Sequence, residues 1–94
     1  MAKTVRASHI LVKTEEEALN LKSEIENGKK FEDLAAMHSL CPSGARGGDL
    51  GTFGKGMMVK PFEDAAFNAE TGKVTNPVQT QFGWHLILVT EKND

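Results

Sequence analysis

The segment from Cys41 to Gly56 constrains the fold most, because it contains six glycines and one proline. Glycine adopts backbone conformations that are closed to other residues, and a segment this rich in it does not form a regular helix or a long strand. We expect a long, shaped loop here, with a short strand near residues 50–53. Loops of this kind often carry functional residues.

The residues before this loop have the pattern of a strand followed by a helix. From Arg6 to Val12 the side chains alternate between two faces, which indicates a strand with His9 inside it. Thr14 and Glu17 have the spacing of a capping box, in which the threonine hydroxyl accepts a hydrogen bond from the backbone N–H three residues on. We therefore expect a helix that begins after Thr14 and ends near Asn27.

Further elements lie on both sides of the glycine-rich loop. Apolar residues recur at helical spacing over residues 31–38, which predicts a second amphipathic helix. Pro61 suits the first position of a third helix, which we expect to end by Gly72. Residues 78–90 are rich in β-formers, and the break at Gly83 predicts two strands joined by a tight turn.

This order of elements predicts an α+β fold with a four-stranded, mainly antiparallel sheet surrounded by helices. The chain has 94 residues, which is enough for one hydrophobic core, so residues 1–94 are expected to form a single domain. Hydrophobic residues make up 39% and charged residues 26%, values typical of globular proteins. This composition argues against disorder.

The net charge and the cysteine content indicate which partners and which cellular compartment to expect. A formal net charge of -2 gives no overall attraction to nucleic acid. The single cysteine, Cys41, has no internal disulfide partner, which fits a reducing compartment. The longest apolar run, residues 86–89, is too short to span a bilayer, and a polar segment follows Met1. We expect a cytoplasmic protein with no membrane span and no nucleic-acid partner.

Five short motifs, in this order and spacing, carry a resemblance to a known family. They are His9–Val12, Cys41–Gly44, Arg46–Gly51, Met58–Phe62 and Phe82–His85. Together the motifs resemble those of the parvulins, which are peptidyl-prolyl cis/trans isomerases. The resemblance implies an FKBP-like arrangement of sheet and helices and a monomer that acts on proline-containing peptides and proteins. It also implies rotation of the bond before proline without a cofactor or a metal.

The resemblance implies an apolar pocket for the proline ring of the substrate. Leu50, Met58 and Phe62 match the positions that form this pocket, and we expect Met58 and Phe62 to be partly solvent-facing in the free protein. Ser43 and Phe82 are weaker candidates, for a hydrogen bond to substrate and for an extension of the apolar wall. The alternative is that Leu50, Met58 and Phe62 are ordinary core residues, as these residue types usually are.

Four residues are candidates for the catalytic centre. By resemblance, His9 and His85 form a pair on neighbouring strands, and Thr80 is placed to orient one of them. Cys41 matches a position where the family carries cysteine or aspartate, which favours an electrostatic role over a covalent one. The alternatives are two satisfied core histidines and a small, partly buried cysteine.

One departure from the family bears on specificity. Parvulins selective for phosphoserine or phosphothreonine before proline carry a longer, arginine-rich loop after the first strand and often a WW domain. Here Lys13 is followed directly by the Thr14 helix cap, which leaves no room for a cluster of arginines. We therefore expect activity that does not depend on phosphate.

Three other functions remain open from the sequence. Cys41 with the histidines resembles a cysteine hydrolase on paper, but no helix visibly begins at Cys41, and Pro42 removes a backbone N–H that an oxyanion needs. His38 and Cys41 have a spacing that two zinc ligands can have, with a second histidine as the third. A holdase that binds proline segments without turnover is the third alternative.

Overall fold

The computed structural model describes residues 3–94, which form one antiparallel sheet with helices on both faces. The elements are β1 (Thr4–Val12), α1 (Glu15–Glu26), α2 (Phe31–His38), a 3-10 helix η1 (Pro42–Arg46), β2 (Asp49–Gly54), α3 (Lys60–Asn68), β3 (Val78–Thr80) and β4 (Gly83–Asn93). The strand order is β2-β1-β4-β3, and each neighbouring pair is antiparallel. The predicted α+β class is confirmed.

Local sequence signals set the bounds of the helices. Thr14 caps α1, because its side-chain oxygen accepts from the Glu17 backbone N–H at 3.2 Å and its hydroxyl donates to the Glu17 carboxylate. The helix α2 spans the residues that the periodicity predicts. Helix α3 begins at Lys60, one residue before Pro61, and ends at Asn68, before Gly72 as expected.

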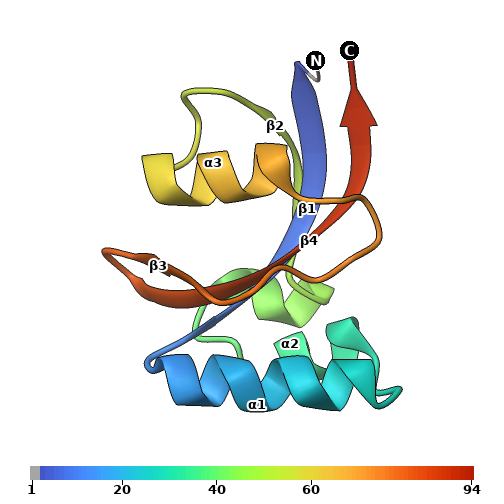
Figure 1. Cartoon of the computed structure of the whole chain (residues 1–94), viewed down its shortest axis with the longest axis vertical. Coiled ribbons are helices and arrows are strands. Elements are labelled where there is room, and N and C mark those ends of the chain that lie inside the picture. The colour runs from blue at the N-terminus through green and yellow to red at the C-terminus, as the bar shows by residue number, and fades with distance from the viewer. Residues whose placement is uncertain (1–2) are drawn as a thin grey trace.

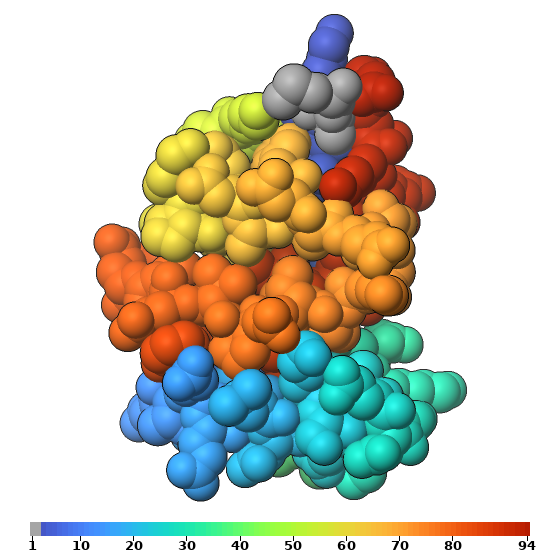
Figure 2. All heavy atoms as spheres, in the orientation of Figure 1, coloured from blue at the N-terminus to red at the C-terminus, as the bar shows by residue number. Residues whose placement is uncertain are grey.

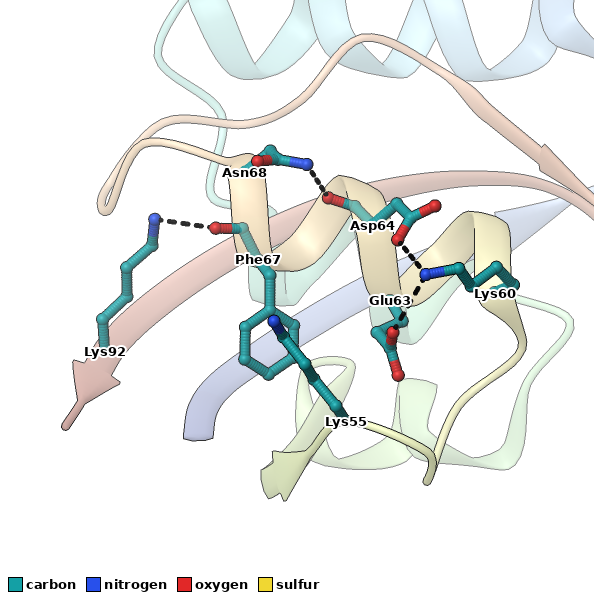
Figure 3. A pocket seen from close by; sticks show the side chains of 7 residues that line it. All are labelled: Lys55, Lys60, Glu63, Asp64, Phe67, Asn68 and Lys92. Carbon is teal, nitrogen blue, oxygen red and sulfur yellow. Dashed lines mark hydrogen bonds and ion pairs between the residues drawn. The ribbon is translucent and has the colours of Figure 1, made fainter. Parts of the chain in front are cut away.

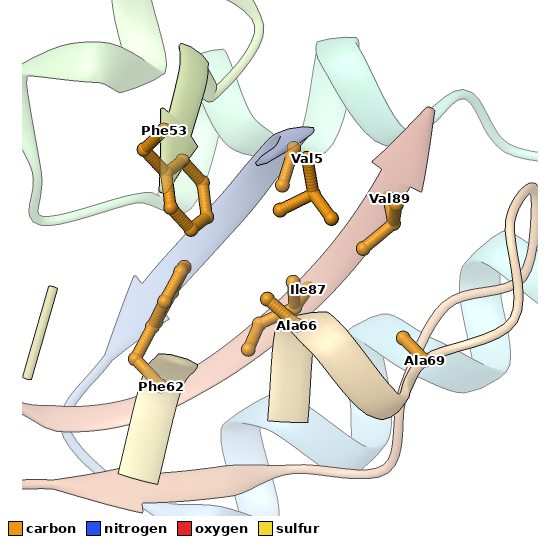
Figure 4. Packing of buried hydrophobic residues seen from close by; sticks show 8 residues of the cluster. Val5, Phe53, Phe62, Ala66, Ala69, Ile87 and Val89 are labelled. Carbon is orange, nitrogen blue, oxygen red and sulfur yellow. The ribbon is translucent and has the colours of Figure 1, made fainter. Parts of the chain in front are cut away.

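The central strands β1 and β4 are buried on both faces of the sheet. On one face α3 covers a cluster that contains Phe53, Phe62 and Ile87, and these side chains converge in Figure 4. On the other face α1 and α2 cover a second cluster, which includes Ile10 and Leu86. In Figure 1 the sheet accordingly runs between α3 at one end of the molecule and the α1–α2 pair at the other. Successive residues of β4 therefore enter different cores.

The glycine-rich segment is more ordered than its composition suggests. Its first part forms η1, which ends at Gly47 in a left-handed conformation. Gly48 follows with φ +87°, and its carbonyl accepts from the His9 backbone N–H at 2.9 Å, while its own N–H donates to the Ser43 carbonyl at 2.8 Å. A Cβ at Gly48 would collide with the His9 carbonyl oxygen. Glycine is required here because the loop lies directly on β1.

The connection between α3 and β3 lies along β4. Gly72 donates to the Val89 carbonyl, Thr75 donates to the Ile87 carbonyl, and Val74 forms an isolated bridge with Leu88. In Figure 2 this segment, in orange, crosses the visible face between α3 and α1. It thereby joins the two helical layers over the sheet.

Among residues 3–94, no helix is both long and apolar enough to cross a membrane.

Candidate active site

An apolar hollow of about 430 Å³ opens between the sheet, α3 and the two loops that flank β2. Its lining residues come from segments far apart in the sequence, and nearly all present carbon or sulfur to the cavity. They are His9, Cys41, Leu50, Met57, Met58, Val59, Phe62, Phe82 and His85. An apolar hollow of this kind suits a small apolar ring.

Two histidines from the central strands form the base of the hollow. His9 of β1 and His85 of β4 are both buried, and their Nδ1 atoms lie 2.9 Å apart. The Nε2 atom of His85 is 2.7 Å from the Thr80 hydroxyl, which in turn accepts from the Phe82 backbone N–H at 3.1 Å. The predicted contacts within the His9–His85–Thr80 group are therefore present, and they fix the His85 ring.

The contact geometry excludes a doubly charged histidine pair, and burial favours the neutral one. A contact of 2.9 Å between two Nδ1 atoms takes one proton, since two cationic rings would direct an N–H at each other. Burial, together with the smaller effect of the neighbouring His85, lowers the pKa of His9 to about 4. Burial also lowers the pKa of His85 to about 4. At neutral pH the base of the hollow is thus polar but uncharged.

These pKa values make folding stability depend on pH in a definite window. Between about pH 6.5 and 4 the histidines of the unfolded chain bind protons that His9 and His85 of the native state do not. The free energy of unfolding should therefore fall as the pH decreases through this window, and these two residues should contribute no pH dependence above it. Urea unfolding followed by Trp84 fluorescence, with NMR titration of the imidazoles, measures both. Midpoints near 6.5 for His9 and His85 in the folded protein would refute the neutral buried pair.

Phe62 belongs to both the pocket and the core. It is 3% exposed, and its ring lies edge-on to the rings of His9 and His85, with centroid distances of 5.5 Å and 5.2 Å. A third aromatic ring, that of Phe53, lies at a centroid distance of 6.1 Å from the Phe62 ring. The expectation that Phe62 is partly solvent-facing is wrong, because β1 and β4 cover one side of the ring and Phe53 another. Met58 is half-buried, as expected, and so is Leu50.

Cys41 reaches the hollow through a loop that is anchored on β1. The Leu40 backbone donates to the Leu11 carbonyl at 2.8 Å, and the Ser39 hydroxyl accepts from the backbone N–H groups of Leu11 and Cys41. Cys41 is half-buried and is the N-cap of η1. The expectation that no helix begins here is wrong. The glycines of this segment predicted a loop, but residues 42–46 form a short 3-10 helix. Pro42 at its start still provides no N–H.

The structure separates the predicted site residues into two groups. The lining includes His9, His85, Cys41, Leu50, Met58, Phe62 and Phe82, the last being 61% exposed at the rim. Ser43 and Thr80 lie behind the lining. Ser43 is buried, and its hydroxyl donates to Cys41 Sγ at 3.3 Å, so it supports the cysteine instead of facing the cavity. Thr80 supports His85 in the same way.

Sequence reasoning missed two of the lining residues. Met57 and Val59 flank the predicted Met58, and all three contribute to one wall of the hollow. Met57 is 68% exposed, as a large apolar side chain at a pocket mouth can be. The run of three consecutive apolar residues before α3 was the available signal.

The zinc alternative finds little support in this geometry. His38 ends α2 at the surface and lines a different hollow from Cys41. Within residues 3–94, no three side chains of histidine, cysteine, aspartate or glutamate are grouped so as to hold a metal ion.

The chain is thus an α+β domain with a small antiparallel sheet, whose central histidines lie under an apolar hollow. Its sequence matches the model of the PPIC-type PPIase domain over residues 1–93. The chain belongs to this peptidyl-prolyl isomerase family, and the resemblance to parvulins is confirmed.

Relatives and solved structures agree with this assignment. The foldase protein PrsA of Geobacillus sp. is 50% identical over 91 residues, which are 96% of this chain and 33% of that protein. The crystal structure of PrsA from Bacillus anthracis superposes with a TM-score of 0.96 at 41% identity, covering 99% of this chain and 43% of that one. The chain thus spans about a third of the length of the curated relatives it matches.

A solved structure of similar length is also close. The solution structure of NmPin, the parvuline of Nitrosopumilus maritimus, has a TM-score of 0.87 at 42% identity and covers 97% of this chain and 99% of that chain. Nearly the whole of that protein thus corresponds to the sheet and helices described above.

Proposed function

We propose that this chain accelerates cis/trans rotation about X-Pro bonds in peptides and proteins, and that it does so without covalent chemistry, cofactor or metal. The observation that carries the proposal is the apolar hollow that ends on a neutral histidine pair and on Cys41. The proline ring would enter the hollow against Met58 and Phe62. The carbonyl before the proline would lie toward Cys41.

The energetics of the reaction suit a site this simple. The two isomers of an X-Pro bond are nearly equal in free energy, and the barrier between them is about 18–20 kcal/mol. No energy source is needed, only tighter binding of the twisted amide than of either planar form. A thousandfold acceleration takes about 4 kcal/mol of such differential binding. Exclusion of water and one or two polar contacts supply energies of this order.

We infer an electrostatic role for Cys41. Planar amide resonance places negative charge on the carbonyl oxygen, and a polar or anionic group beside that oxygen disfavours it. The Ser43 hydroxyl donates to Cys41 Sγ, so the sulfur is held in one orientation. A hydrolytic role is less well supported, because Pro42 removes the following N–H from a potential oxyanion hole.

We further propose substrates without phosphate and a monomer that acts in the cytoplasm. The connection from β1 to α1 consists of Lys13 and Thr14 alone, and Thr14 is occupied as a helix cap. That connection supplies no arginine for a bidentate contact with a phosphate. The single cysteine supports a reducing compartment. The net charge of -2 argues against nucleic acid as a partner.

Exchange spectroscopy on X-Pro peptides tests the proposal. With catalytic amounts of protein, in chelator and without nucleotide, NMR exchange between the cis and trans signals should become faster. A phosphorylated Ser-Pro peptide should gain no advantage over its unmodified form. Peptide binding with unchanged exchange rates would instead establish a holdase.

A further inference from the structure

The turn that joins β2 to α3 lines the hollow, and its side chains pack on the fold, but its backbone has few hydrogen-bond partners. Residues 57–59 line the hollow, and Gly56 has φ +90°, which glycine alone adopts readily. In the described part of the chain, a single hydrogen bond ties the backbone of residues 55–58 to the rest of the fold. Its donor is the Gly56 N–H and its acceptor is Glu63 Oε1, at 2.6 Å.

Glu63 is unusual because it is a buried acid. Its side chain is only 10% exposed, and it lies in the first turn of α3, directly after Phe62. A buried carboxylate is costly unless it is well paired. The Lys60 ammonium is 3.6 Å from Glu63 Oε2 but only 2.9 Å from Asp64 Oδ1, and Figure 3 shows this lysine between the two acids. Lys60 is therefore shared, and itself largely exposed.

The tight contact of Glu63 is thus with the turn. A distance of 2.6 Å is short for an N–H donor and indicates a charge-assisted hydrogen bond. The N-terminal turn of α3 also favours a negative charge at this position. Both effects hold the carboxylate where it can accept from Gly56, one residue before Met57.

We propose that Glu63 is a positioning residue: its carboxylate oxygen holds the Gly56 turn so that Met57 and Met58 stay in the lining of the hollow. The proposal rests on the proposed isomerase function. Glu63 does not touch the substrate. Without its acceptor, the turn would move away from α3 and the proline ring would lose one wall of its site.

Two substitutions separate the reach of Glu63 from its charge. Glu63→Gln keeps a side-chain oxygen at the same distance and loses the charge, whereas Glu63→Asp keeps the charge and is one methylene shorter. The matched control is Asp64→Asn on the exposed side of α3. Each variant is measured for hydrogen exchange of the Gly56 amide and for kcat, KM and peptide Kd, with Tm as the check on folding.

We expect Glu63→Asp to expose the Gly56 amide and to raise KM and peptide Kd about tenfold, which corresponds to about 1.4 kcal/mol, with kcat little changed. Glu63→Gln keeps the acceptor and loses the charge, so its KM and peptide Kd should lie between those of Glu63→Asp and the unmodified protein, whereas Asp64→Asn should stay within about twofold of the unmodified protein. The proposal would be overturned if Glu63→Asp left Gly56 amide exchange, KM and peptide Kd unchanged. It would also be overturned if Glu63→Gln raised KM and Kd as much as Glu63→Asp does.

The two proposals fail in different ways. If the unmodified protein does not accelerate X-Pro exchange, the proposed isomerase function is refuted. Hydrogen exchange of the Gly56 amide and peptide Kd still decide the role of Glu63 in that case. If Gly56 becomes exposed in Glu63→Asp with Kd unchanged, the turn has no effect on the pocket, and the positioning role is overturned although the enzyme assignment stands.

Discussion

Replacing Phe62 with alanine should cost about 3–5 kcal/mol of folding stability and most of the isomerase activity. The ring is 3% exposed and packs against Phe53 on one side and against His9 and His85 on another. Its removal would leave a cavity in the core under α3 and would release the histidine pair. Urea unfolding and X-Pro exchange on the same sample measure the two losses.

Met58→Ala is the matched control for this prediction. Met58 is half-buried and packs at the edge of the same cluster, so its truncation should cost only about 1 kcal/mol of stability while still weakening peptide binding. A Phe62→Ala protein that folds with little loss of stability would show that the ring is not part of the core. Full activity in its folded fraction would show that the ring is not part of the pocket.

The second large effect is expected at Cys41. Cys41→Ala should lower kcat/KM at least tenfold more than Cys41→Asp, a difference of about 1.4 kcal/mol or more. Aspartate keeps a polar group beside the substrate carbonyl and can accept from Ser43, as the sulfur does. Alanine does neither. Exchange spectroscopy on both variants, with folding followed by Trp84 fluorescence, measures the difference.

A covalent mechanism makes a different prediction for these variants. A carboxylate is a poor substitute for a thiolate as a nucleophile, so both Cys41→Asp and Cys41→Ala would be almost inactive. Equal inactivation of two folded variants that still bind peptide would contradict the electrostatic role of Cys41. Ser43→Ala is a further control, because it removes the hydrogen bond to Sγ and leaves the thiol in place.

Local patterns in the sequence predicted the elements well. The capping box at Thr14 and the apolar spacing of residues 31–38 depend on neighbours within one or two turns, and both helices have the expected bounds. The prediction that successive side chains of residues 84–89 face opposite sides of the sheet is also confirmed, since Leu86 and Ile87 enter different core clusters. These features follow from chain geometry alone.

Contacts between different elements and loops could not be predicted in the same way. The fit of Gly48 against His9 and the bond from Gly56 to Glu63 depend on how loops lie on the finished sheet. The burial of Phe62 has the same origin, because its two sides are covered by different elements. The motifs of the family gave the site residues, but not which of them face the cavity.

The central claim is that an X-Pro bond rotates in the hollow above the histidine pair. The most direct test adds an X-Pro peptide to isotope-labelled protein and records cis/trans exchange together with intermolecular NOEs. Faster exchange with NOEs from the proline ring to the Met58 methyl group and the Phe62 ring is the predicted result. Unchanged exchange, or NOEs from the proline only to the hollow beside Lys55 and Phe67, would contradict it.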